Sequence, residues 1–127
     1  MQALGRHVLA EVYGCDPNVL NDVGAVERIL VRAAQEAGAE VRETAFHKFS
    51  PQGVSGVVVI SESHLAVHTW PELAYAALDI FTCGERVDPW LACDLIVAHF
   101  RASHMTATES KRGILLAQQP VAMAVGS

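Results

Sequence analysis

The spacing of apolar residues along the chain divides it into strand-like and helix-like segments. In six segments the apolar side chains either alternate with polar ones or run almost without interruption, which is typical of β-strands. Glycine, proline and serine separate several of these segments and mark turns. The expected strands are 5–12, 41–49, 54–60, 65–70, 75–83 and 104–111.

Two further segments have apolar residues at helical spacing, and each begins with an Asp-Pro pair, at 16–17 and 88–89. Aspartate can accept the free N–H groups of a first helical turn, and proline suits the first helical position. We expect helices over 17–37 and 89–101, with Gly38 ending the first. Their expected core-facing side chains are Leu20, Val23, Val26, Ile29, Leu30, Ala33, Ala34 and Ala37 in the first and Trp90, Leu91, Ile96, Val97 and Phe100 in the second.

This order of elements predicts an α+β fold, a two-layer α/β sandwich in which two helices cover one face of a mainly antiparallel sheet. The other face also carries apolar side chains, so a partner should cover it, and a homodimer is the simplest partner. From about Leu115 the chain is rich in small apolar residues and glutamine. We expect this tail to be partly disordered or laid on a partner.

Composition indicates one compact domain, because 127 residues with 51% hydrophobic content can form a substantial core. No apolar run is long enough to cross a bilayer, and no signal peptide is recognisable, so we expect a cytoplasmic protein without a membrane partner. Three cysteines without framework spacing indicate free thiols. The net charge of −5 argues against nucleic acid and agrees with a cationic small substrate.

Reactive side chains are concentrated in residues 61–84. Pro71 ends the strand before it, and residues 71–74 connect 65–70 to 75–83 as a hairpin. Such a hairpin could bring His68, Trp70 and Cys83 together on one sheet face, where histidine and thiol could exchange a proton. The polar members of the window are Ser61, Glu62, Ser63, His64, His68, Glu72, Asp79 and Cys83.

Other interpretations of this window remain. A histidine and a cysteine on a half-buried strand are more often packed or solvated than catalytic. No C-x-x-C pair or helical histidine pair supports a zinc site, and no G-x-S-x-G turn surrounds Ser63, as a hydrolase triad would require. The residue pattern alone therefore indicates a reactive pair of strands, and no metal.

Three motifs carry a resemblance to a known family. These are SESHL at 61–65, HTWPE at 68–72 and FTCG at 81–84. Together they resemble the signature of the small prokaryotic S-adenosylmethionine decarboxylase proenzymes, which are pyruvoyl-dependent, and the likeness extends from the first strand to 111–113. The resemblance implies a homodimer with four layers (helix, sheet, sheet, helix) and active sites built from both protomers.

The resemblance also implies a covalent cofactor. Decarboxylation of an amino acid leaves a carbanion, which needs an electron-accepting carbonyl that no ordinary side chain offers. A pyruvoyl group would arise from Ser63 when its hydroxyl attacks the Glu62 carbonyl, and the chain would separate into 1–62 and 63–127. By resemblance, Ser55 and His68 assist this processing, and Cys83 returns a proton to the substrate's α-carbon.

Substrate-binding positions follow from the same likeness. Phe49 and Trp70 correspond to aromatic residues that hold adenine, and Glu72 to the carboxylate that binds ribose. Plain core packing for the two aromatics and an ordinary solvated carboxylate for Glu72 are the alternatives. Cys15 and Cys93 match no catalytic position, and Cys93 is expected in the core.

Three functions are therefore under consideration. The first is decarboxylation of S-adenosylmethionine, which supplies the aminopropyl donor for spermidine synthesis. The second is a pyruvoyl-dependent arginine or ornithine decarboxylase on the same scaffold. The third is a non-catalytic regulatory homologue, against which the joint presence of Ser63, His68 and Cys83 argues.

Overall fold

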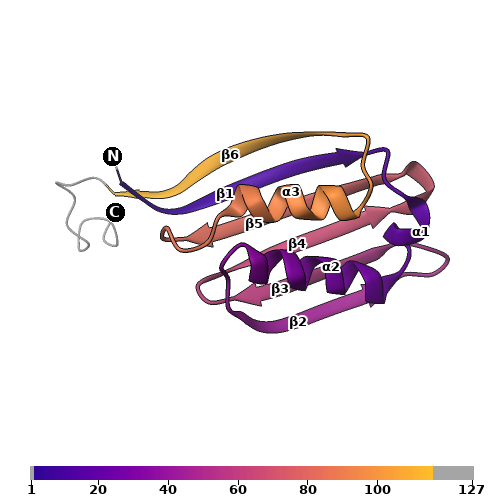
Figure 1. Cartoon of the computed structure of the whole chain (residues 1–127), viewed down its shortest axis with the longest axis horizontal. Coiled ribbons are helices and arrows are strands. Elements are labelled where there is room, and N and C mark those ends of the chain that lie inside the picture. Colours follow the sequence, from indigo (N-terminus) through magenta and orange to yellow (C-terminus); the bar gives the residue numbers. More distant parts are fainter. Residues whose placement is uncertain (1, 116–127) are drawn as a thin grey trace, which may run out of the picture.

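The computed structural model describes residues 2–115, which form one sheet with helices on one side (Figure 1). The strands are β1 (Gln2–Tyr13), β2 (Val41–Lys48), β3 (Val54–Ile60), β4 (Ser63–Trp70), β5 (Tyr75–Cys83) and β6 (His104–Leu115). The helices are α1 (Pro17–Leu20), α2 (Val23–Glu36) and α3 (Pro89–His99), with a short 3-10 helix η1 (Pro71–Leu73). The expected tail beyond Leu115 lies outside the described residues.

The six strands form a single sheet in the order β2-β3-β4-β5-β1-β6, and every neighbouring pair is antiparallel. The predicted α+β class and the antiparallel sheet are thus confirmed, as is the hairpin of β4 and β5. The N-terminal strand β1 lies between β5 and β6, so the sheet joins segments that are far apart in the sequence. The four-layer dimer stays a prediction.

The first helix differs from expectation, because the chain forms two helices, α1 and α2, where one was predicted over 17–37. Asp22 accepts a hydrogen bond from Ala25 N at 3.0 Å and so caps a new helix. The amide oxygen of Asn21 accepts a bond from Gly53 N at 3.0 Å. The break therefore lets the helix layer hold the loop between β2 and β3.

Both Asp-Pro pairs start helices as predicted. Asp16 accepts from Asn18 N at 2.9 Å, and Asp88 accepts from Trp90 N and Leu91 N at 3.1 and 3.2 Å. These carboxylates satisfy N–H groups that have no partner within the helix. The helix α3 ends at His99, slightly earlier than expected.

The core lies between the helices and the sheet. Each large side chain that is fully buried there contributes about 1.5–3 kcal/mol relative to an exposed one. Leu91 was expected in this core but is 41% exposed, on the outer side of α3. The largest fully buried side chains include Leu20, Val26, Leu30, Ile96 and Phe100 from the helix layer and Val8, Val12, Val58, Leu65, Leu78 and Ile80 from the sheet.

The opposite face of the sheet, here called the open face, has no helix over it among residues 2–115 (Figure 1). Strand alternation places Leu9 and Trp70 there, since their neighbours Val8 and Thr69 are buried under the helices. Leu9 is 40% and Trp70 39% exposed. Apolar side chains are thus present on both faces, as the sequence predicted.

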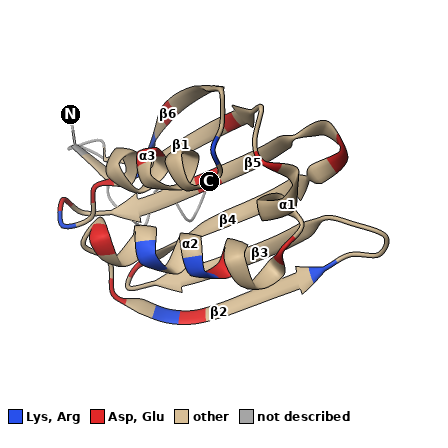
Figure 2. Ribbon diagram, turned by 45° about the vertical axis from the view of Figure 1, so that its right-hand side comes forward, with Lys and Arg blue, Asp and Glu red and all other residues tan. Residues whose placement is uncertain are grey.

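Charges of both signs lie along α2 and β2, without separation into a basic and an acidic element (Figure 2). On the edge of the sheet, for example, Arg42 pairs with Glu40 at 2.9 Å. None of the helices between residues 2 and 115 is long and apolar enough to cross a membrane.

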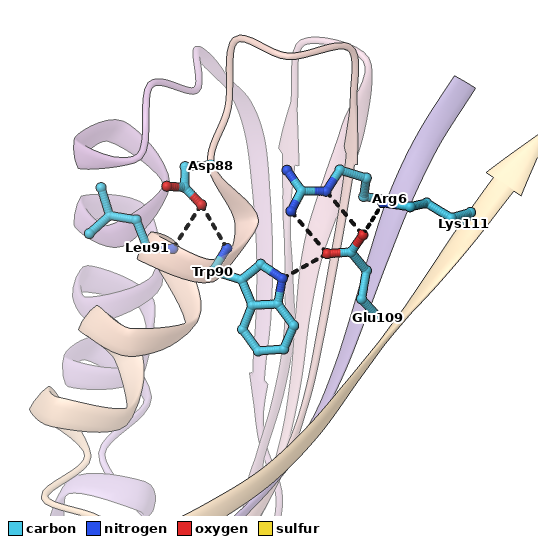
Figure 3. A network of polar contacts seen from close by, with 6 residues as sticks. All are labelled: Arg6, Asp88, Trp90, Leu91, Glu109 and Lys111. Carbon is cyan, nitrogen blue, oxygen red and sulfur yellow. Dashed lines mark hydrogen bonds and ion pairs between the residues drawn. The ribbon is translucent and has the colours of Figure 1, made fainter. Parts of the chain in front are cut away.

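Glu109 joins β6 to β1 and α3 (Figure 3). Its carboxylate accepts two bonds from the Arg6 guanidinium at 2.9 and 3.2 Å, one from the Trp90 indole N–H at 2.7 Å, and one from Lys111. These donors, Arg6 above all, lower the pKa of Glu109 from its ordinary 4.5 to about 2. The network holds the start of α3 against the paired strands.

We therefore predict that Glu109→Gln destabilises the protein by about 1–2 kcal/mol at pH 7, as expected for the loss of charge-assisted hydrogen bonds. Because the folded-state pKa is lowered, this stabilisation is complete above about pH 4.5 and is lost as the pH falls towards about 2. Melting temperatures across this range should show the gap between wild type and variant closing in acid. The exposed Glu43→Gln is the control, and an equal loss there would contradict the prediction.

Candidate active site

A cavity of about 320 Å³ opens at the end of β4, beside η1 and the loop between β2 and β3. It brings together five of the residues singled out in the sequence, namely Phe49, Ser55, His68, Trp70 and Glu72, and is completed by Gln52, Gly53 and Thr69. Phe49 is 46% exposed, so its ring is available for contact with a ligand or a partner. The site thus combines aromatic walls with a carboxylate.

Ser55 and His68 form a direct pair within this cavity. They lie opposite one another in the β3–β4 ladder, and Ser55 Oγ is 2.8 Å from His68 Nδ1. The backbone ladder holds the Cβ atoms of directly opposed residues about 4.5–5.5 Å apart on one sheet face, which is close enough for these two side chains to meet. The hydroxyl and the imidazole are therefore positioned to share a proton.

Trp70 is supported from behind by other aromatic rings. Its ring stacks on Tyr75 with centroids 5.3 Å apart, and Tyr75 stacks in turn on Tyr13 at 5.5 Å. The Tyr75 hydroxyl donates to the Glu11 carboxylate, which raises the pKa of Tyr75 to about 12. Trp70 thus forms a wall of the cavity that is backed by an aromatic stack.

Thr69 fixes the floor of the cavity from the buried side. Its hydroxyl accepts from Val54 N at 2.9 Å and donates to Leu20 O at 2.8 Å. Both partners would otherwise be unsatisfied in the core. The cavity is consequently anchored to the end of α1.

The other group of reactive residues lies at the opposite end of β4. Ser63 is the first residue of this strand and Glu62 precedes it in the turn after β3. In the β4–β5 register His64 lies opposite Phe81, which places Cys83, half-buried at the end of β5, beside this turn. Ser63 and Cys83 therefore share one end of the hairpin.

The expectation that the hairpin brings His68 and Cys83 together is wrong within one chain. His68 lies opposite Ala77, six residues before Cys83, and a strand rises about 3.3 Å per residue. The two groups share the open face but are about 20 Å apart along it. The antiparallel register causes this separation, because residues near the hairpin connection pair with one another and those at the free ends do likewise.

Sequence reasoning missed a cluster around Phe81 on the open face. The His7 ring stacks on Phe81 with centroids 5.4 Å apart, His64 meets it edge-on at 5.8 Å, and the Arg112 guanidinium lies 5.5 Å from its centre. His7 Nε2 is also 3.1 Å from Asp79 Oδ1. Alternation in each strand was the available signal, but the insertion of β1 between β5 and β6 was not predicted.

The remaining cysteines lie away from these groups. Cys15 and Cys93 are buried, and burial raises the pKa of each thiol to about 11. The placement of Cys93 in the core is confirmed. Within residues 2–115, no three histidine, cysteine or acidic side chains are grouped so that they could hold a metal ion.

The fold and the site together define a small α+β enzyme with His68, Trp70 and Cys83 on the uncovered face of an antiparallel sheet. The family described as S-adenosylmethionine decarboxylase matches residues 6–113. The chain belongs to this family, and the resemblance found in the sequence is confirmed.

Individual relatives agree with this assignment. S-adenosylmethionine decarboxylase proenzymes from Acetivibrio thermocellus and Caldicellulosiruptor saccharolyticus are 67% and 68% identical over 124 residues, 98% of each chain. The corresponding proenzyme of Pelotomaculum thermopropionicum is 70% identical over 115 residues, 91% of each chain. The crystal structure of the adenosylmethionine decarboxylase from Aquifex aeolicus superimposes with a TM-score of 0.87 at 30% identity, covering 94% of this chain and 99% of that one.

Proposed function

We propose that the protein cleaves itself between Glu62 and Ser63 and then decarboxylates S-adenosylmethionine, with a pyruvoyl group derived from Ser63 as its covalent cofactor. The cavity that gathers Phe49, Trp70 and Glu72 beside the Ser55–His68 pair is the observation that carries this proposal. Family membership and relatives named proenzymes give it independent support.

The residues around position 63 fit the formation of such a group. The Ser63 hydroxyl would attack the Glu62 carbonyl carbon, and the amide C–N bond would break as the nitrogen takes a proton, which leaves an ester. Loss of the Ser63 α-proton then breaks the bond between the Ser63 β-carbon and the ester oxygen. The main-chain carboxylate of Glu62 is the leaving group and becomes the new C-terminus. The resulting dehydroalanine, as its imine, takes up water and releases ammonia. Ser63 is half-buried at the start of β4, and Cys83 lies at the same end of the hairpin, so the product would form near a thiol.

When present, the pyruvoyl carbonyl supplies the electron acceptor for decarboxylation of an α-amino acid. Cys83 would return a proton to the α-carbon once CO₂ has left, because a thiol is a competent proton donor near neutral pH. Phe49 and Trp70 would stack on the adenine and Glu72 would accept hydrogen bonds from the ribose hydroxyls.

The geometry of β4 supports an active site shared between two copies. Ser63 and His68 are five residues apart on one strand, about 17 Å, so His68 is beyond reach of Ser63 in its own chain. Consider two copies whose open faces meet, related by a two-fold axis that lies between the sheets and is perpendicular to the strands. The strands of the partner subunit then run opposite to those they face. This arrangement would place Ser63 and Cys83 of one subunit against Ser55 and His68 of the partner subunit.

Self-cleavage predicts two polypeptides, residues 1–62 and 63–127, with a pyruvoyl group in place of the amino terminus of the second. Intact-mass measurement of the purified protein checks this directly. Ser63→Ala should remain a single chain, because it has no hydroxyl to form the ester. A wild-type protein that stays whole and releases no CO₂ would instead indicate a non-catalytic homologue.

The substrate is tested with carboxyl-labelled compounds. Labelled CO₂ should be released from S-adenosylmethionine but not from arginine or ornithine, because the cavity offers aromatic walls for a purine. Trp70→Ala should raise KM for S-adenosylmethionine about tenfold, within the range of about 1–3 kcal/mol for loss of a base-stacking partner. Release from a basic amino acid alone would contradict the assigned substrate.

A shared site also predicts complementation between inactive variants. Homodimers of His68→Ala and of Cys83→Ala should each be inactive, whereas their heterodimer contains one site with every side chain intact. Random pairing makes half of the dimers hybrid, and each hybrid has one intact site of its two. Co-expression should therefore recover about a quarter of wild-type activity.

The matched control for complementation is co-expression of His68→Ala with Ser55→Ala. Both changes fall in the same half of the site, so every site in the hybrid carries a defect. Recovery in this control, or its absence in the first mixture, would contradict a site shared across the interface.

A further inference from the structure

The turn between β3 and β4 contains an unusual backbone conformation. Ser61 and Glu62 alone separate the paired residues Ile60 and Ser63, and Glu62 has a φ of 75°. In this left-handed region the Cβ atom crowds the following carbonyl, so residues other than glycine and asparagine are disfavoured. Glu62 is therefore strained, and its carbonyl belongs to the peptide bond that the proposed self-cleavage would break.

The structure holds the turn in this conformation from outside. Ser61 N donates to Glu40 O at 2.9 Å, and Ser61 Oγ donates to the Glu40 carboxylate at 2.9 Å. Arg42 Nε donates to Ser61 Oγ at 2.8 Å and its guanidinium pairs with Glu40. With the β-ladder continuing at Ser63, the turn is fixed on both sides of Glu62 and cannot relax by moving as a unit.

We propose that the left-handed backbone of Glu62 is a positioning element of self-cleavage, which raises the energy of the intact 62–63 peptide bond and is released as that bond becomes an ester. The inference rests on the proposed self-processing. When Ser63 Oγ bonds to the Glu62 carbonyl carbon, the C–N bond breaks and the hydroxyl proton passes to the nitrogen. The path from this carbon to the Ser63 Cα atom then lengthens by one atom, since Oγ and Cβ replace N. Glu62 is then no longer confined to a two-residue turn.

The exposed carboxylate of Glu62 is not required for this effect, so the test separates backbone from side chain. Glu62→Ala removes the carboxylate but keeps Cβ and hence the strain. Glu62→Gly removes both, and Glu62→Asn keeps a side chain that tolerates the left-handed region. The half-time for conversion of the single chain into 1–62 and 63–127 is followed by gel and intact mass after synthesis of each variant.

The half-time of cleavage should be shortest for Glu62→Ala, longer for Glu62→Asn and longest for Glu62→Gly. The glycine variant should take about three- to tenfold longer than the alanine variant, because it removes the left-handed strain. In a Ser63→Ala background, which blocks cleavage, the glycine variant should melt no lower than the alanine variant. If glycine only made the turn more flexible, cleavage would slow and the uncut chain would also melt at a lower temperature. Slower cleavage without a lower melting temperature therefore points to relief of strain.

Arg101 provides the matched control. It also has a left-handed φ, 57°, but lies in the exposed loop after α3. Arg101→Gly relieves comparable strain and should leave the processing half-time unchanged from that of Arg101→Ala.

The outcomes are distinct. Three results would overturn the role of Glu62 while self-processing stands. These are cleavage of Glu62→Gly as fast as that of Glu62→Ala, cleavage of Glu62→Asn no slower than that of Glu62→Ala, and a lower melting temperature of the uncut chain with glycine than with alanine. If the wild-type chain itself never cleaves, the proposed function fails first.

Discussion

The structure depends on the antiparallel register that β4 makes with its two neighbours. One ladder places Ser55 beside His68, and the other places Cys83 beside the turn that precedes Ser63. Side chains alternate between the two faces, so a slip of one residue would turn His64 and His68 under the helices. The buried side chains of Leu65 and Val67 oppose such a slip. The same apolar contacts that build the core thus orient the chemistry outwards.

Because helices cover only one face of the sheet, its two faces have different roles. The covered face carries the core, and the open face carries His68 and Cys83 together with exposed apolar side chains such as Leu9. Apolar surface next to polar reactive groups is typical of a face that another molecule covers. In the proposed shared site, this one face would serve both the association of two chains and catalysis.

Local patterns predicted most elements but not their long-range arrangement. The strands 54–60 and 75–83 have the predicted bounds, because alternation and flanking turn residues mark both ends. The helix break at Asn21 was missed, since apolar spacing continues through Leu20 and Val23 and hides the cap at Asp22, and the bond from Gly53 to Asn21 joins distant segments. The Phe81 cluster was missed because no local signal places β1 between β5 and β6. The candidate pocket residues were found through motif resemblance, whereas composition and periodicity had reached only a reactive pair of strands.

The strand order has a mechanical consequence for a chain that is cut after Glu62. The first piece would supply β1, β2 and β3 and the second β4, β5 and β6, yet the sheet alternates between them as β2-β3, β4-β5, β1 and β6. Three ladders, β3 with β4, β5 with β1 and β1 with β6, would span the two pieces. Neither piece could leave without opening the sheet at several places, so an interlaced topology lets the molecule lose a covalent link at its centre and still behave as one body.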